Sequence, residues 1–291
     1  MEYRKKLFIF FVIVCLFYYL FKSVTSSVFL KGRDKINVVF YGENTSFYSL
    51  DRKNISYLLS FPNSIKVMVP GGYGEYKIGA VGKLASLEKK PEIIRKTFST
   101  ATASLVDLYF YPKKTTIYHQ DSENNSKGMP TINEIFLSNS NATLIDRFLL
   151  VNFFMTKDRE NYQVIDLKPF AIGHNNSTFD YNGFYKKFQG NFFQRTFRSL
   201  DINVQIVYKK SYNTALLLSQ IIEGEGIRVV DLTIQDKLIK GCLLIANKEI
   251  GMTKTFERLA NFFKCNLKIG ETTVSDIILV LGDLEKEWAV N

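Results

Sequence analysis

The chain has 291 residues, and its 38 Lys and Arg against 28 Asp and Glu give a formal net charge of +10. The cations are dispersed along the sequence rather than clustered, so this charge indicates no nucleic-acid partner. The length exceeds that of one small module and is enough for two domains of ordinary size.

The first predicted element is the uncharged apolar run from Leu7 to Phe21, which follows three consecutive cations at Arg4 to Lys6. The run is shorter than the ~20 residues that a helix needs to cross a bilayer, but Lys22 can extend its ammonium to the interface while the helix continues past it. Residues 1–34 are therefore predicted to form a short cytoplasmic tip and a single-pass membrane anchor, with the bulk of the chain extracytoplasmic. A cleaved signal peptide and a buried core helix are the alternatives.

Residues 35–168 are predicted to form an α/β domain. Three β-branched and aromatic runs, Ile36–Tyr41, Ser56–Phe61 and Ile65–Val69, are typical of buried strands. Turn residues separate the second run from the third, so these two strands are expected to form a hairpin. Further on we predict helices at Glu92–Ala103 and Leu144–Phe154, strands at Leu105–Tyr111 and Tyr162–Leu167, and an exposed loop between Lys113 and Ser140.

Three glycines follow the third predicted strand, just before a helix that is expected to begin at Ile78. A glycine loop that opens a helix presents unpaired N–H groups and the positive end of the helix dipole, and both favour an anion. The spacing matches neither a Walker nor a Rossmann loop, and a glycine turn placed for packing is the alternative. The candidate anion or ligand loop consists of Gly71, Gly72, Tyr73, Gly74, Lys77 and Lys83.

Three stretches stand together behind the apolar run: Phe40 to Asn44, Ser60 to Ile65, and Lys77 to Ala80. In that order they resemble the Gly-x-Asp strand end, the S-I-P-R-D-T turn and the K-I-N-x-A helix start of the LytR-CpsA-Psr family of extracytoplasmic proteins. The resemblance implies an α/β domain and, in active members, transfer of a glycopolymer from a polyprenyl-diphosphate carrier to peptidoglycan. In that family arginines hold the pyrophosphate, and Asp binds Mg²⁺ or activates the acceptor.

This chain departs from that pattern at the residues that carry the chemistry. The Arg and Asp positions of the turn are Asn63 and Ser64, and the acid of the earlier strand end is Asn44. Neither Asn nor Ser can neutralise a diphosphate. The domain is therefore predicted to be a reduced version of the family's fold that has lost its catalysis.

Residues 169–200 are predicted to be an aromatic connector. Phe184, Phe188 and Phe192 recur at i, i+4 and i+8, which is the spacing of one helical face. We expect a helix packed between two domains. Because lysines and arginines surround the aromatic face, a helix lying on the membrane surface is the alternative.

Residues 201–291 are predicted to form a second, smaller α/β domain that resembles the LytR C-terminal domain. The resemblance rests on the INVQIVY strand, the ALLLSQIIEGEGIRVVDL helix and strand, the RLANFFKC helix end and the closing DIILVLGD. The N-G-T-G turn common to that module is replaced here by Tyr208 to Ser211.

Cys242 and Cys265 lie in this domain, and the sequence leaves open whether they pair. Strands are predicted at Ile202–Tyr208, Ile227–Leu232, Cys242–Ala246 and Asp276–Leu281, and helices at Tyr212–Glu223 and Thr253–Lys264.

Together these features predict a membrane-anchored, extracytoplasmic cell-envelope protein that is non-catalytic and binds a wall polymer, a polyprenyl-linked precursor or an envelope partner. His and Cys show no metal-ligand spacing, so the sequence predicts neither a metal site nor a cofactor. The alternative is an active glycopolymer phosphotransferase with relocated residues. It would need Mg²⁺ and would bring Arg33, Arg52 and Arg95 together at a cavity.

Overall fold

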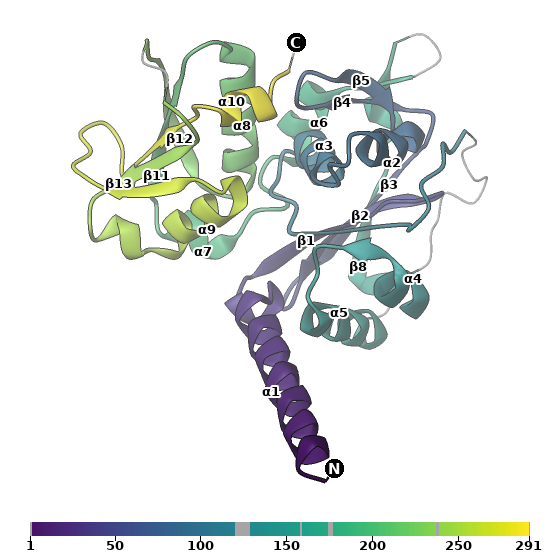
Figure 1. Ribbon diagram of the computed structural model, residues 1–291. Coiled ribbons are helices and arrows are strands. Elements are labelled where there is room, and N and C mark those ends of the chain that lie inside the picture. The colour runs from purple at the N-terminus through teal and green to yellow at the C-terminus, as the bar shows by residue number, and fades with distance from the viewer. Residues whose placement is uncertain (1, 120–128, 158, 174–176, 237–238, 291) are drawn as a thin grey trace.

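The computed structural model describes the whole chain except residues 1, 120–128, 158, 174–176, 237–238 and 291. One helix, α1 (Glu2–Ser26), projects alone from the folded body (Figure 1). It includes the apolar segment Tyr3–Ser26. Only 6% of the 18-residue apolar stretch within this segment is buried against the rest of the chain. By length and composition α1 can cross a membrane, and it is longer at both ends than the Leu7–Phe21 run that predicted it.

A six-stranded sheet forms the centre of the N-terminal unit, by which we mean residues 27–200. Its order is β7-β6-β1-β2-β3-β8, with β1, β2 and β3 antiparallel, β6 parallel to β1 and β8 parallel to β3. The strands are β1 (Lys35–Phe40), β2 (Thr45–Asp51), β3 (Ser56–Phe61), β6 (Leu108–Tyr111), β7 (Asn139–Ser140) and β8 (Tyr162–Ile165).

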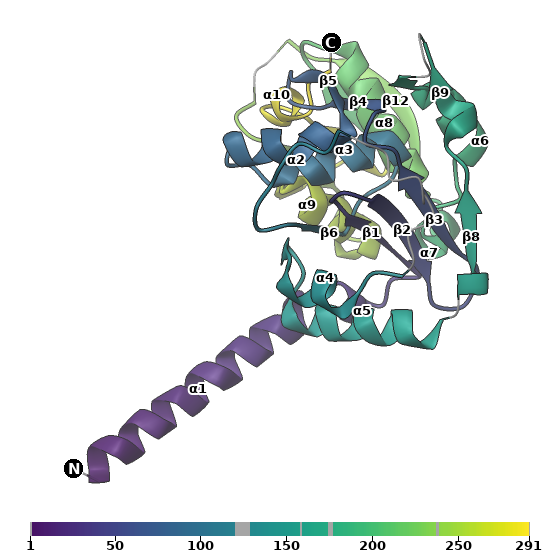
Figure 2. The same cartoon turned by 90° about the vertical axis from the view of Figure 1, so that its right-hand side faces the viewer.

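Both faces of this sheet are covered, and neighbouring residues of one strand enter different cores. Val39 on β1 packs in a cluster with Ile94 and Phe98, whereas Val38 packs in a second cluster with Leu150. The covering helices are α2 (Ile78–Leu87) and α3 (Glu92–Thr102) on one face, and α4 (Ile132–Leu137) and α5 (Leu144–Thr156) on the other (Figure 2).

A small second sheet corrects the predicted hairpin. Strand β4 (Lys66–Val69) does not pair with β3, because the chain leaves the large sheet after Phe61. It pairs instead with β5 (Gly74–Lys77), antiparallel, in a sheet ordered β5-β4-β10-β9. The other two strands are β9 (Ala171–Ile172) and β10 (Thr178–Phe179). The turn chemistry at residues 62–64 therefore marks a change of sheet.

The predicted helices of the N-terminal unit are present, and α4 was not predicted. Helix α5 begins with a capping box in which Thr143 and Asp146 satisfy each other's backbone N–H groups. Helix α4, also started by a capping box, lies within the stretch predicted as an exposed loop, part of which falls outside the described residues. Short 3-10 helices occupy Phe29–Lys31, Arg159–Asn161, Lys168–Phe170 and Ile250–Met252.

The aromatic connector is two helices rather than one. Helix α6 (Tyr181–Phe188) ends two residues before Gly190. The φ of Gly190 is 87°, which is not a helical backbone conformation, and a second helix, α7 (Arg195–Ser199), follows. Phe184 and Phe192 are buried in the N-terminal core, and Phe197 is buried in the C-terminal core. The aromatic face is therefore covered by protein, which contradicts the membrane-surface alternative.

The C-terminal unit, residues 201–291, is built on a five-stranded sheet of order β12-β11-β15-β13-β14. Strands β12, β11 and β15 are parallel, β13 runs antiparallel to β15, and β14 is parallel to β13. Cys242 and Cys265 form a disulfide with Cα atoms 4.6 Å apart. The strands are β11 (Asn203–Tyr208), β12 (Arg228–Ile234), β13 (Leu243–Ala246), β14 (Asn266–Ile269) and β15 (Ile277–Val280); the helices are α8 (Tyr212–Gly224), α9 (Lys254–Phe263) and α10 (Leu284–Glu287).

Candidate functional site

The predicted glycine loop closes the β4–β5 hairpin. Gly71, Gly72 and Gly74 have φ values of 99°, 79° and 79°, which favour glycine because a side chain is strained there. Helix α2 begins at Ile78 as predicted, but strand β5, which starts at Gly74, places residues 75–77 between the last glycine and the helix. The loop therefore does not lie at the N-terminus of the helix, and the helix dipole does not act on it.

Backbone N–H groups of the loop are already engaged by the other end of the chain. The amides of Gly71 and Gly72 donate hydrogen bonds to the carbonyl oxygen of Ala289, at 2.9 and 3.0 Å. A Cβ at Gly71 would lie 3.1 Å from the Tyr73 ring and 3.5 Å from the carbonyl oxygen of Glu287. The two amides therefore join the hairpin to the C-terminal tail, and the tightest neighbour of a Cβ at Gly71 is the Tyr73 ring of the hairpin itself.

Beside this contact lies a groove of about 670 Å³, which we call the inter-unit groove. The hairpin loop forms one side, the turn into α3 forms the second, and α10 forms the third. Its lining residues are Pro70, Gly71, Tyr73, Lys89, Lys90, Pro91, Glu92, Ile93, Lys96, Asp283, Lys286 and Glu287.

The rim of the inter-unit groove carries an excess of unpaired positive charge. Lys89, Lys90 and Lys286 form no ion pair with any residue that the structure describes. Asp283 is the one acid of the lining that also lacks an ion pair there, and its carboxylate accepts a hydrogen bond from the backbone N–H of Gly241 at 2.8 Å. Lys96, by contrast, is paired with Glu287 at 2.8 Å, and burial lowers the pKa of its ammonium. Three lysines therefore remain available to an anionic ligand.

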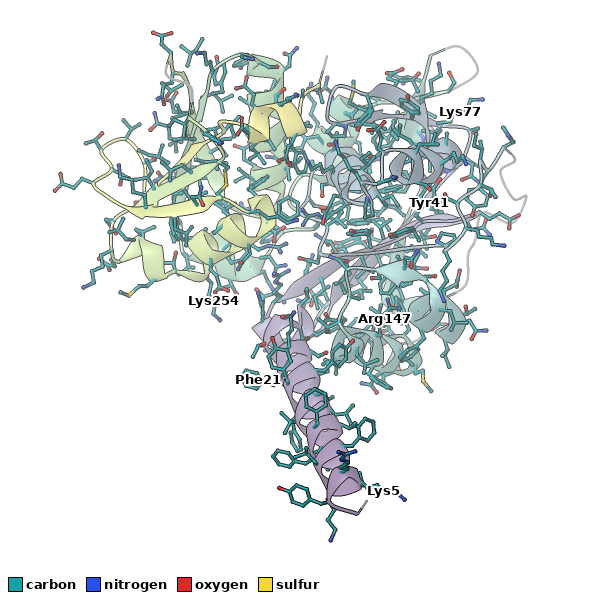
Figure 3. The ribbon with its side chains drawn as sticks, in the orientation of Figure 1. Lys5, Phe21, Tyr41, Lys77, Arg147 and Lys254 are labelled. Carbon is teal, nitrogen blue, oxygen red and sulfur yellow. A yellow bond between two sulfur atoms is a disulfide. The ribbon has the colours of Figure 1, made fainter. Side chains whose placement is uncertain are left out.

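Of the six residues of the predicted loop, only Gly71 and Tyr73 line the groove; Gly72 and Gly74 lie in the same hairpin outside the lining, and the two lysines lie elsewhere. Lys77 and Lys83 are exposed and do not line the groove, and Figure 3 shows Lys77 on the side of the N-terminal unit that faces away from the C-terminal unit. Tyr73 lines the groove, and its hydroxyl donates to Glu88 at 2.9 Å. Gly71 lies at the groove, and sequence reasoning did not include its lysines, Lys89, Lys90 and Lys286.

A C-terminal clasp, residues 284–290, joins the two units. The Trp288 side chain is 1% exposed and packs against the rings of Phe262 and Phe263. Glu287 binds Lys96 of the N-terminal unit, and Ala289 accepts the two glycine amides described above. The clasp therefore forms one wall of the groove and fixes its position.

The same clasp contacts the turn from Tyr208 to Ser211. The carboxylate of Glu285, which is 6% exposed, accepts hydrogen bonds from the backbone N–H groups of Lys209 at 3.1 Å and Lys210 at 2.6 Å, and from that of Ser211. A second cavity of about 370 Å³ lies next to this turn. An anion preference of the turn is thus satisfied by the chain's own carboxylate.

Arg33, Arg52 and Arg95 do not converge. Arg33 contacts Asp107, and Arg52 donates to the backbone carbonyl of Phe29. Arg95 lies with its guanidinium 4.5 Å from the centre of the Phe262 ring and pairs with Glu92 at 2.6 Å.

Asn63, one of the positions that the sequence comparison singled out, takes part in contacts with the backbone. Asn63 is buried, and its side chain donates to the carbonyl of Glu43 at 2.7 Å. Its own carbonyl accepts from Gly79 at 3.1 Å, and the Tyr41 hydroxyl donates to the carbonyl of Ile78 nearby. These bonds join the end of β1 to the start of α2.

A buried ionic cluster lies between the two units. Asp107 contacts Arg33 and lies 2.6 Å from Arg258, which in turn lies 2.8 Å from Glu225. Burial raises the pKa of the Glu225 carboxyl to about 7, and the neighbouring Arg258 opposes that rise. The nearby Gly224 would place a Cβ 1.6 Å from the carbonyl oxygen of Ala103, so the units are in intimate contact here.

Among the residues that the structure describes, no group of three or more His, Cys, Asp and Glu side chains is placed to hold a metal ion. No protein-family model, curated protein or solved structure matches this chain. The resemblance to the LytR-CpsA-Psr family and to the LytR C-terminal domain therefore stays a prediction from the sequence.

Proposed function

We propose that this protein is a single-pass, membrane-anchored cell-envelope protein whose body lies outside the cytoplasm and binds an anionic envelope polymer in the inter-unit groove. The observation that carries the proposal is the free-standing apolar helix α1. Only 6% of its 18-residue apolar stretch is buried by the rest of the chain. Such a helix in water would expose a continuous apolar surface. A bilayer removes that cost.

The orientation is supported by two features at opposite ends of the chain. Arg4, Lys5 and Lys6 precede the apolar run, and positive charge favours the cytoplasmic side. The disulfide between Cys242 and Cys265 fits an oxidising, extracytoplasmic compartment, because the cytosol keeps most thiols reduced.

The binding role is supported by the charge of the groove. Lys89, Lys90 and Lys286 offer three ammonium groups on an open rim, and ammonium groups bind phosphate as point charges. The groove is bounded by the glycine hairpin, α3 and α10, so a ligand there would contact both units. We place the phosphotransferase alternative second, because Arg33, Arg52 and Arg95 each engage a different partner within the protein.

Binding can be tested with full-length protein in detergent micelles and a soluble poly(glycerol phosphate) probe, using isothermal titration calorimetry at low and high salt. The double variant Lys89→Glu/Lys90→Glu should weaken binding at least about tenfold, or ~1.4 kcal/mol. The control Lys77→Glu/Lys83→Glu makes the same change in net charge away from the groove and should retain most of the affinity. Equal losses in both variants, or no binding by the wild-type protein, would rule out the groove as the binding site.

A further inference from the structure

Helix α5 is apolar on both of its sides. Leu150, Phe153 and Phe154 are buried in the core of the N-terminal unit, as expected for the inner face of a covering helix. On the outer face, however, the Phe148 side chain is 58% exposed and that of Met155 is 76% exposed. A surface helix of a soluble domain normally carries polar residues on that face.

Helix α4 extends the same exposed apolar surface. Ile132 is 57% exposed, Leu137 is 59% exposed, and the ring of Phe136 lies edge-on against that of Phe148 with centroids 5.1 Å apart. We call Ile132, Leu137, Phe148 and Met155 the basal face. Exposed apolar side chains grouped in this way usually mark a contact surface.

The junction with α1 fixes where the basal face lies. The Ser23 hydroxyl accepts a hydrogen bond from the amide of Ile145 at 3.3 Å, and the Ser27 hydroxyl donates to the Asp146 carboxylate at 2.7 Å. The amide of Phe29 also donates to Asp146, which is 1% exposed. The outer end of the apolar helix is therefore bonded to the first turn of α5. Figures 1 and 2 both show α4 and α5 at the end of the body from which α1 leaves.

From this geometry we propose that the basal face lies on the bilayer that α1 crosses, with its apolar side chains at the boundary between headgroups and acyl chains. The inference rests on the proposed anchoring. Because α1 brings the basal face to the membrane surface, the lipid is already at an effective concentration that a separate partner would lack. An interfacial helix gains free energy from the apolar area that it removes from water.

The proposal can be tested on the full-length protein in vesicles of zwitterionic and anionic phospholipid, with a spin label at single cysteines. The label is attached to the cysteine of the variant Phe148→Cys or Met155→Cys. Both variants also carry Cys15→Ala, and the two disulfide-bonded cysteines do not react with the label. The matched control is Ile172→Cys, because Ile172 is 47% exposed and its strand β9 lies at the end of the body remote from α1 (Figure 2). The measurement is accessibility to oxygen against accessibility to a water-soluble nickel chelate.

Labels at 148 and 155 should be more accessible to oxygen than to the nickel chelate, whereas the label at 172 should show the reverse. Equal access of the chelate to all three positions overturns the proposal. Shielding from both reagents also overturns it, because that result indicates a second protein copy rather than lipid. A label on the native Cys15, midway along α1, reports insertion separately. If that label is reached by the chelate, the anchoring has failed rather than the docking of the basal face.

Discussion

Replacing Arg258 with Met tests whether the buried ionic cluster stabilises the contact between the two units. The Arg258 side chain is 5% exposed and lies 2.6 Å from Asp107 and 2.8 Å from Glu225. The substitution keeps much of the aliphatic volume, but it leaves Glu225 buried without the cation that contacts it. Removing one partner of a buried ion pair costs about 3–5 kcal/mol, so the free energy of unfolding should fall by about that amount.

The loss can be measured by urea unfolding of the full-length protein in micelles, followed by the fluorescence of the single tryptophan, Trp288. The matched control is Arg228→Met. Arg228 pairs with Asp201 at 3.6 Å, but the two side chains are 67% and 77% exposed, so that variant should lose less than about 1 kcal/mol. A loss in Arg258→Met no larger than in Arg228→Met would refute the assignment of a stabilising role to the cluster.

The same variant has a pH dependence whose sign follows from Glu225. Burial raises the pKa of this carboxyl from 4.5 to about 7, so between these values the native state holds a proton that the unfolded state has released. The stability due to this group therefore falls as the pH rises through that window. Without Arg258 the charged carboxylate is disfavoured further, so the defect should be larger at about pH 8 than at about pH 5. Arg258→Met/Glu225→Gln should recover part of the loss at the higher pH.

Two further predictions concern the C-terminal clasp. Trp288→Ala removes a side chain that is 1% exposed and should lower the free energy of unfolding by about 3–5 kcal/mol, measured by urea unfolding followed by circular dichroism. Gly71→Ala should lower the melting temperature more than Gly72→Ala. Both positions have φ > 0, but only at Gly71 would a Cβ meet a neighbour, the Tyr73 ring at 3.1 Å. Equal shifts in the two glycine variants would show that backbone strain alone accounts for the effect.

Local patterns in the sequence predicted the elements in which large apolar residues recur at the spacing of a strand or of one helical face. Strands β1 and β3 and the inner face of α3 were identified because β-branched and aromatic residues recur there. Strand β2 was missed although it is buried throughout, because Thr45, Ser46, Ser49 and Asp51 interrupt its apolar pattern. Strand β14 was missed because it has only four residues, so the alternation of Leu267 and Ile269 with polar residues is too short to stand out.

The candidate site was only partly accessible to sequence reasoning. The glycines could be found, because a cluster of three is visible in one short stretch. Their partner, Ala289, and the groove lysine Lys286 come from the far end of the chain, and only the tertiary fold brings them to Gly71. Lys77 and Lys83 were chosen because they are near the glycines in sequence, yet Lys77 ends strand β5, Lys83 lies in helix α2, and neither lines the groove.

The two proposals together favour a polymer over a polyprenyl-linked precursor as the ligand. Helix α3, which lines the inter-unit groove, and α5, which carries the basal face, cover opposite faces of the six-stranded sheet. If the basal face lies on lipid, the groove opens on the side of the sheet away from the headgroups. A diphosphate attached to a lipid would stay at the bilayer surface, whereas a phosphate-rich polymer extends from it and can reach Lys89 and Lys286.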